Sequence, residues 1–199
     1  MIDVSIEIIE KEWPRIQESI LKYVNNYDLC IQAGGHKGLY PKKLSKLFNS
    51  VITFEPYKEN YNDLVLNCTE CNIKHYNLAL GAYSKRVSMK QTQINNTGNI
   101  VISDGNDTET VTIDSLNLES CDLIQLDIER YEMFALIGAI KTIEKHRPVI
   151  ILEGPETTNN TCNRILEQLG YDEVDRAGYD TVFKYTNRPK PYCQYEERI

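Results

Sequence analysis

The sequence predicts an α/β protein with a doubly wound, mostly parallel sheet and helices on both faces. Three observations predict it. Apolar runs typical of strands alternate with amphipathic runs, a glycine-rich turn (IQAGGHKGLY, residues 31–40) follows the first strand of that series, and two strand-like runs flank Gly178. The alternation implies parallel pairing through right-handed crossovers. The two runs around Gly178 are close enough for a hairpin, so we expect the sheet to end with an antiparallel strand.

The predicted elements follow one another in a regular order. The apolar runs typical of strands are residues 27–33, 51–55, 73–80, 122–128 and 148–153. The runs with helical spacing are residues 41–48, 57–68, 131–146 and 161–171. Apolar strands that alternate with helices of about this length are typical of a parallel sheet covered on both faces.

The first residues do not continue this alternation. Residues 2–8 alternate apolar and polar side chains, which predicts a strand with one buried face or an arm that binds a partner. Residues 16–24 follow Pro14 with helical spacing. We therefore expect an N-terminal strand and helix extension at 1–26, a single domain at 27–187, and a surface or poorly ordered tail at 188–199. A homo-oligomer formed through the N-terminal segment is left open.

Composition excludes several classes of function. The formal net charge of −7 and a pI near 5.1, without a basic stripe, argue against a nucleic-acid-binding surface. The chain has no apolar run that resembles a signal peptide or a membrane span, so we expect a cytoplasmic protein that binds no membrane. The only CxxC pair, Cys68 and Cys71, lacks a second pair, so free thiols are expected and no metal site is predicted.

The candidate site lies where the predicted strands end, because ligands of open α/β sheets bind outside the carboxyl ends of strands. Gly34, Gly35 and Gly38 follow the first strand of the alternating series and either let a ligand approach the backbone or simply make a tight turn. Glu55 ends the next strand, 17 residues after Gly38, where a carboxylate can accept both hydroxyls of a ribose.

The segment DLIQLDIERYE (122–132) brings several carboxylates to one strand end. Asp127 and Glu129 suit a cationic amino group, a metal or a substrate hydroxyl proton, and with Glu153 they would bind Mg²⁺ if the three converge. Glu132 fits the N-terminus of the following helix. The polar section 82–109 has one probable strand, RVSMK, and is either an acceptor-binding flap or plain surface.

In order along the chain, QAGGHKGLY, ITFEP, NLALG, VTIDSL, DLIQLDIERYE and RPVIILE resemble the FkbM-type S-adenosylmethionine-dependent methyltransferases. The resemblance covers about residues 29–153. It implies a seven-stranded class I, Rossmann-like fold with S-adenosyl-L-methionine as cofactor. It also implies O-methylation of a hydroxyl group on a sugar, glycan or small natural product.

The resemblance implies a role for each matched position. The methionine end of the cofactor would lie among the glycines, the ribose at Glu55, and the adenine beside Leu78 and Ala79. The reacting methyl would face Asp127, which is the first candidate for the base that takes the hydroxyl proton. Glu129 and His36 are the other candidates.

Three residues depart from the family's pattern. Gln32 stands where the family has a loop carboxylate, His36 where it has Asn, and Arg130 where it has Gly in a D-x-E-G-x-E run. We expect the Gln32 oxygen to accept a hydrogen bond from the cofactor's ammonium group without supplying the charge. These departures leave open a degenerate methyltransferase fold that binds a ligand or partner without catalysis. A nucleotide-dependent oxidoreductase is disfavoured by the glycine spacing.

Overall fold

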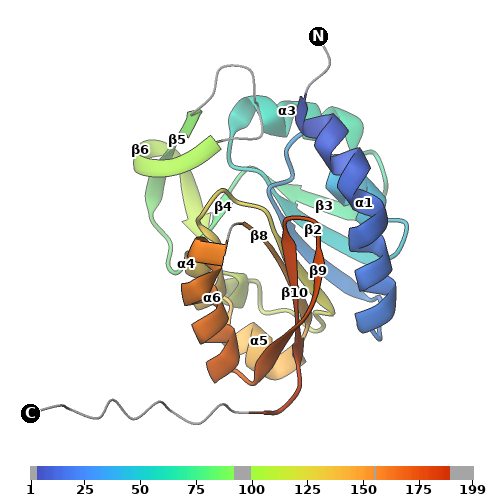
Figure 1. Cartoon of the computed structure of the whole chain (residues 1–199). Coiled ribbons are helices and arrows are strands. Elements are labelled where there is room, and N and C mark those ends of the chain that lie inside the picture. Colours follow the sequence, from blue (N-terminus) through green and yellow to red (C-terminus); the bar gives the residue numbers. More distant parts are fainter. Residues whose placement is uncertain (1–3, 92–99, 155, 189–199) are drawn as a thin grey trace, which may run out of the picture.

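A seven-stranded sheet forms the centre of the computed structural model, which describes residues 4–91, 100–154 and 156–188 (Figure 1). Its strand order is β3-β2-β1-β7-β8-β10-β9, with parallel pairing from β3 to β8 and antiparallel pairing of β10 with both β8 and β9. This confirms the predicted fold, including the C-terminal hairpin. The strands are β1 (Leu29–Ala33), β2 (Ser50–Phe54), β3 (Ile73–Tyr76), β7 (Leu123–Leu126), β8 (Val149–Glu153), β9 (Tyr171–Ala177) and β10 (Asp180–Tyr185).

Helices cover both faces of the sheet, and each face has its own apolar core. One face carries α1 (Val4–Tyr23) and α2 (Leu39–Leu44), with α3 (Lys58–Asn67) packed beside the glycine loop. The other face carries α4 (Glu132–Ile137), α5 (Ile140–His146) and α6 (Glu156–Gln168). Alternate side chains of β7 point to the two faces, so Leu123 joins the core under α1 and Ile124 the core under α4 to α6.

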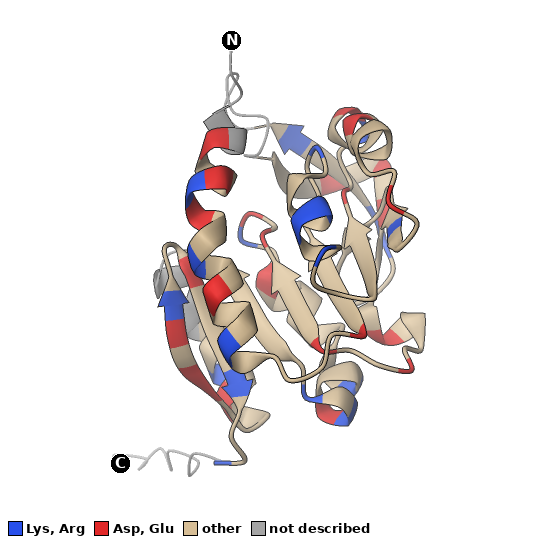
Figure 2. Ribbon diagram, turned by 90° about the vertical axis from the view of Figure 1, so that its right-hand side faces the viewer, with Lys and Arg blue, Asp and Glu red and all other residues tan. Residues whose placement is uncertain are grey.

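The N-terminal strand predicted at residues 2–8 is wrong where the structure describes it, because helix α1 begins at Val4 and runs without a break through Pro14. Residues 1–3 lie outside the described residues. Ile9 is buried and Ile8 is 43% exposed, so the helical spacing decides which apolar side chains pack on the sheet. Figure 2 shows acidic and basic residues along this helix. The predicted oligomer contact through this segment stays a prediction.

A second, three-stranded sheet with the order β4-β6-β5 stands beside the first (Figure 1). The run predicted as one strand over 73–80 divides into β3 and β4 (Ala79–Leu80), since β4 leaves the main sheet to pair with β6 (Ile100–Val111). The strand predicted at RVSMK is confirmed as β5 (Arg86–Gln91), and it pairs with β6. The rest of the predicted flap, residues 92–99, and the tail from residue 189 onward lie outside the described residues.

The helix predicted over 131–146 is two helices, α4 and α5, joined at Gly138. A Cβ on Gly138 would lie 2.0 Å from the backbone oxygen of Gly81, so this glycine lets the β4 segment approach the helix pair. A short 3-10 turn, η1 (Ile113–Leu116), leads from β6 towards β7. These connections place the ends of β1, β2, β7 and β8 at one edge of the main sheet.

Candidate active site

A pocket opens at the carboxyl ends of β1, β2, β7 and β8, with α1 and the β5–β6 hairpin as its outer walls. Its volume is about 150 Å³, below the roughly 300–1,000 Å³ of most ligand sites. The lining residues with polar side chains are Glu12, His36, Tyr40, Glu55, Asn60, Asp127, Glu129 and Glu153, and Gly34 lines the pocket with its backbone.

Glu55 is a buried carboxylate in this pocket that accepts two backbone hydrogen bonds. The backbone N–H of His36 donates to its Oε2 at 2.7 Å, and that of Tyr57 donates to its Oε1 at 2.8 Å. Burial raises the pKa of Glu55 to about 7, although the two backbone hydrogen bonds oppose that rise. Each carboxylate oxygen keeps a further lone pair, so the pair of oxygens can accept from two neighbouring hydroxyls.

The three glycines of the first loop have different surroundings. Gly34 lines the pocket with φ +82°, and a Cβ there would lie 1.9 Å from the Asp127 backbone oxygen. Gly35 and Gly38 do not line the pocket. Cβ atoms on them would meet side chains of α3 and the residue after it, at 2.5 Å from Leu64 Cδ1 and 2.6 Å from Cys68 Sγ respectively. Their small size therefore serves helix packing, while Gly34 shapes the ligand side.

Gln32 is placed differently from what we expected. It is fully buried and outside the pocket lining, and the Thr53 hydroxyl donates to its Oε1. Its Nε2 donates to the backbone oxygens of Ala33 and Gly34, at 3.0 and 3.1 Å. The amide therefore links β1 to β2 and supports the loop from below, instead of offering its oxygen to a ligand.

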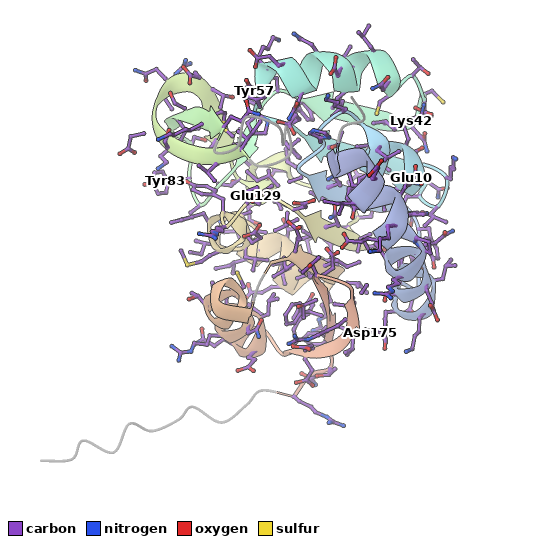
Figure 3. All side chains as sticks on the ribbon, turned by 45° about the horizontal axis from the view of Figure 1, so that its top comes forward. Glu10, Lys42, Tyr57, Tyr83, Glu129 and Asp175 are labelled. Carbon is purple, nitrogen blue, oxygen red and sulfur yellow. The ribbon has the colours of Figure 1, made fainter. Side chains whose placement is uncertain are left out.

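Three carboxylates line the other end of the same pocket. Asp127 and Glu129 follow β7, and Glu153 ends β8. Burial, and then the nearby charge of Glu153, raise the pKa of Asp127 well above its usual range. The same two causes raise the pKa of Glu129 to about 7. Figure 3 shows Glu129 between the β5–β6 hairpin and helix α1.

The backbone around the candidate bases is in an uncommon conformation. His36, Glu129 and Arg130 have φ values of 45°, 53° and 75°, in the left-handed region that glycine and, to a lesser degree, Asn and His adopt most easily. Two of the three departures from the family's pattern thus fall on left-handed residues. The backbone N–H of Ile128 donates to Glu132 Oε1 at 3.1 Å and helps to hold this loop. Glu132 therefore has the structural place expected for it at the start of α4.

Apolar side chains form the remaining wall of the pocket. Leu78 and Ala79 line it as the adenine assignment requires, together with Phe54, Leu80, Met89, Ile100 and Ile102. Met89, Ile100 and Ile102 belong to the β5–β6 hairpin, and they were not predicted because the sequence pattern of that section is weak. Glu12 was missed because the helix was predicted to start only after Pro14. Tyr40 and Asn60 lie on helices, where the sequence offers no sign of which face meets a ligand.

The convergence of Asp127, Glu129 and Glu153 does not produce a metal centre in the described part of the chain. No three His, Cys, Asp or Glu residues there are arranged to hold a metal ion. Likewise, none of the helices in residues 4–91, 100–154 and 156–188 is long and apolar enough to cross a membrane.

Gly34, Glu55 and the acids that follow β7 thus line one pocket at the strand ends of a doubly wound sheet. The methyltransferase FkbM domain matches residues 32–180, and the chain belongs to this family. A comparison with curated protein sequences found no match.

Solved structures show the same fold at low identity. An FkbM methyltransferase from Methylobacillus flagellatus is 18% identical with a TM-score of 0.57, and the match covers 80% of this chain and 44% of that one. This chain thus spans less than half of that protein. The ribosomal protein L11 methylase of Lactobacillus delbrueckii subsp. bulgaricus is 13% identical (TM-score 0.52, covering 86% and 74%), and the N-methyltransferase NodS of Bradyrhizobium japonicum is 12% identical (TM-score 0.53, covering 92% and 97%).

Proposed function

We propose that this chain binds S-adenosyl-L-methionine and methylates a hydroxyl oxygen of a sugar, glycan or small natural product. The observation that carries the cofactor assignment is Glu55, a buried carboxylate fixed by two backbone N–H groups at the end of β2. Glu55 lies beside the end of β1, which pairs with β2 on one side and with β7 on the other, so the strand order reverses its direction at β1. Ligands of doubly wound sheets bind at that switch point.

The lining residues fit the parts of the cofactor. Glu55 would accept the ribose hydroxyls, Leu78 and Ala79 would flank the adenine, and the turn at Gly34 would lie beside the methionine end. The bound cofactor supplies an activated methyl group, so the chain mainly has to align the acceptor oxygen and exclude water. The apolar hairpin residues of the pocket wall serve the second purpose.

A base that takes the acceptor's proton completes the chemistry. Asp127, Glu129 and His36 all line the pocket, as the assignment requires. The pKa of Glu129, about 7, suits a base that must be ionised at neutral pH and still attract a proton. The pKa of Asp127 is raised well above its usual range, first because the side chain is buried and then because of the charge of Glu153.

Calorimetric titration with S-adenosylhomocysteine tests the cofactor assignment, and transfer of a labelled methyl group to glycans and hydroxylated compounds tests the reaction. We expect one binding site per chain and base-stable label in the product, as an ether gives. Absence of binding at millimolar ligand would refute the proposal. Binding without transfer to any acceptor would favour a non-catalytic ligand-binding protein, which the left-handed Arg130 in the acidic loop also favours.

A further inference from the structure

Four carboxylates form what we call the acidic subsite, between helix α1 and the edge of the main sheet: Glu12, Asp127, Glu153 and Asp180. Glu153 and Asp180 are directly opposite each other in the antiparallel pairing of β8 and β10. Like charges in such a cross-strand pair repel each other at Cβ separations of about 5 Å. Glu12 reaches the same place from α1, since its Oε1 lies 3.4 Å from where a Cβ on Gly178 would be.

Strand alternation turns these side chains towards α1. Leu123, Ile151 and Val182 belong to the core under α1. Side chains two residues away along a strand share a face, so Glu153 and Asp180 lie on that same side. Gln125 and Asp127 follow Leu123 at the same spacing, so the Gln125 side chain lies on the same face of the sheet, two residues before Asp127.

One neutral polar side chain on this face, besides the acids, has no hydrogen-bond partner among the described residues. Gln125 is 1% exposed, and neither its Nε2 nor its Oε1 has a hydrogen-bond partner among the described residues. Asp180 is 2% exposed, and its Oδ2 has no partner there either. Buried polar atoms are rarely left without partners, because each costs about 1–3 kcal/mol.

A partner with positive charge would match these carboxylates. None of the described residues that line the pocket is Lys or Arg, while four of its carboxylates besides Glu55 face the same space. No metal-binding arrangement exists among the described residues. An organic ammonium group fits better, because its three N–H donors match carboxylate and amide oxygens and because Tyr40 lines the same space with an aromatic ring.

We propose that the acidic subsite binds a protonated amino group of the methyl acceptor, which makes the acceptor an amino alcohol such as an amino sugar unit. The inference rests on the proposed function for the identity of the acceptor. The sheet order separates the subsite from the ribose position, since Glu55 lies on β2 and the subsite lies across β7, β8 and β10. The cofactor would thus occupy one end of the pocket and the amine the other.

Isothermal titration with matched amines tests the inference. The probes are glucosamine, galactosamine, tyramine and chitosan tetramer, each paired with its N-acetyl form, which keeps the hydroxyls and removes the charge. With the protein saturated in S-adenosylhomocysteine, we expect at least one amine to bind at least tenfold more tightly than its N-acetyl partner. If no pair shows this preference, the inference is wrong.

Two variants locate the binding. Glu153→Gln and Glu12→Gln should each reduce the amine preference at least fivefold, while Glu144→Gln, an exposed acid on α5, should leave it unchanged. Glu12 is on the outer helix, so its variant keeps the test valid if the β8 variant fails to fold. A preference that survives both substitutions would overturn the inference.

The ammonium group that binds the acidic subsite could instead be that of the cofactor. The same variants distinguish the cofactor's ammonium group from that of the acceptor. We expect Glu153→Gln to leave the affinity for S-adenosylhomocysteine within about twofold of the unsubstituted protein. A loss equal to the loss of amine affinity would assign the subsite to the cofactor and refute the inference. If the protein does not bind S-adenosylhomocysteine at all, the proposed function fails, and the amine preference measured without it still decides whether the subsite binds ammonium.

Discussion

The two ends of the pocket treat buried carboxylates in opposite ways. At the β2 end, both oxygens of Glu55 accept hydrogen bonds from backbone N–H groups that the loop geometry fixes. At the β8 end, Glu153 and Asp180 face each other, and one Asp180 oxygen has no partner among the described residues. The β2 end therefore presents a carboxylate that is already fixed for accepting hydroxyl groups, whereas the acids at the β8 end require a cation or bound protons.

The largest effect should come from the acids that join the two ends. Asp127→Asn and Glu129→Gln each remove a candidate base while preserving shape. Loss of the true base should lower turnover roughly 10²–10⁴-fold with cofactor affinity retained. Steady-state rates with an identified acceptor, together with titration of S-adenosylhomocysteine, measure both quantities. If turnover and affinity fall together, the substituted residue is a cofactor ligand instead.

The next effect is on stability and pH. The folded protein keeps protons on Glu55 and Glu129 up to about pH 7, whereas the unfolded chain releases them near pH 4.5. The free energy of unfolding should therefore fall as the pH rises from about 4.5 to above 7, by on the order of 3 kcal/mol for Glu55 alone. Urea unfolding at several pH values measures this slope.

A matched pair of variants tests whether the pH dependence of the unfolding free energy comes from carboxyl groups in the pocket. Glu129→Gln should flatten the profile, and the exposed Glu144→Gln should not. A profile that rises over the same interval would contradict the assignment of raised pKa values to this pocket.

A smaller change concerns the support beneath the glycine loop. Gln32→Glu keeps an acceptor for Thr53 and loses the donor to the Ala33 and Gly34 carbonyls. We expect a loss of about 1–3 kcal/mol in unfolding free energy and no gain in cofactor affinity. Tighter binding of S-adenosylhomocysteine would show that residue 32 faces the ligand after all.

The smallest effect is a gain in stability. Arg130 has φ 75°, which costs a residue with a side chain about 1 kcal/mol and costs glycine little. Arg130→Gly, which restores the family's residue, should raise the unfolding free energy by up to about 1 kcal/mol. Arg130→Ala is the control, because it removes the charge and keeps the strain. Equal stability of the two variants would show that conformation at this position does not matter.

The sequence predicted the sheet well because burial on both faces makes β1, β7 and β8 almost continuous apolar runs. The sequence-based prediction was wrong at α1, because apolar and polar residues alternate there over a few positions as they do in a strand. Packing of the helix on the sheet buries Ile9 and leaves Ile8 exposed. The sequence placed Glu55 and Asp127 in one pocket because strand ends meet at one edge. It could not place Gln32, whose direction depends on the hydroxyl of Thr53 on the neighbouring strand.

The pocket-lining residues of α1 and of the β5–β6 hairpin could not be predicted from the sequence, because their position also depends on tertiary contacts. Glu12, Met89 and Ile102 reach the pocket through tertiary packing of elements that are distant in the sequence. No local pattern records such a contact. The acidic subsite could be recognised only once the register of β8 and β10 put Glu153 opposite Asp180.

If Glu55 holds the ribose of S-adenosyl-L-methionine, the unsubstituted protein and Glu55→Ala must differ in their affinity for S-adenosylhomocysteine. Calorimetry at pH 8, where the Glu55 carboxyl is ionised, should show one site per chain and a loss of about 1.5–3 kcal/mol in the variant. The same titration at pH 6 should show weaker binding by the unsubstituted protein, since a protonated carboxyl offers one acceptor fewer. Equal affinity of the two proteins at pH 8 would show that Glu55 does not hold the ribose.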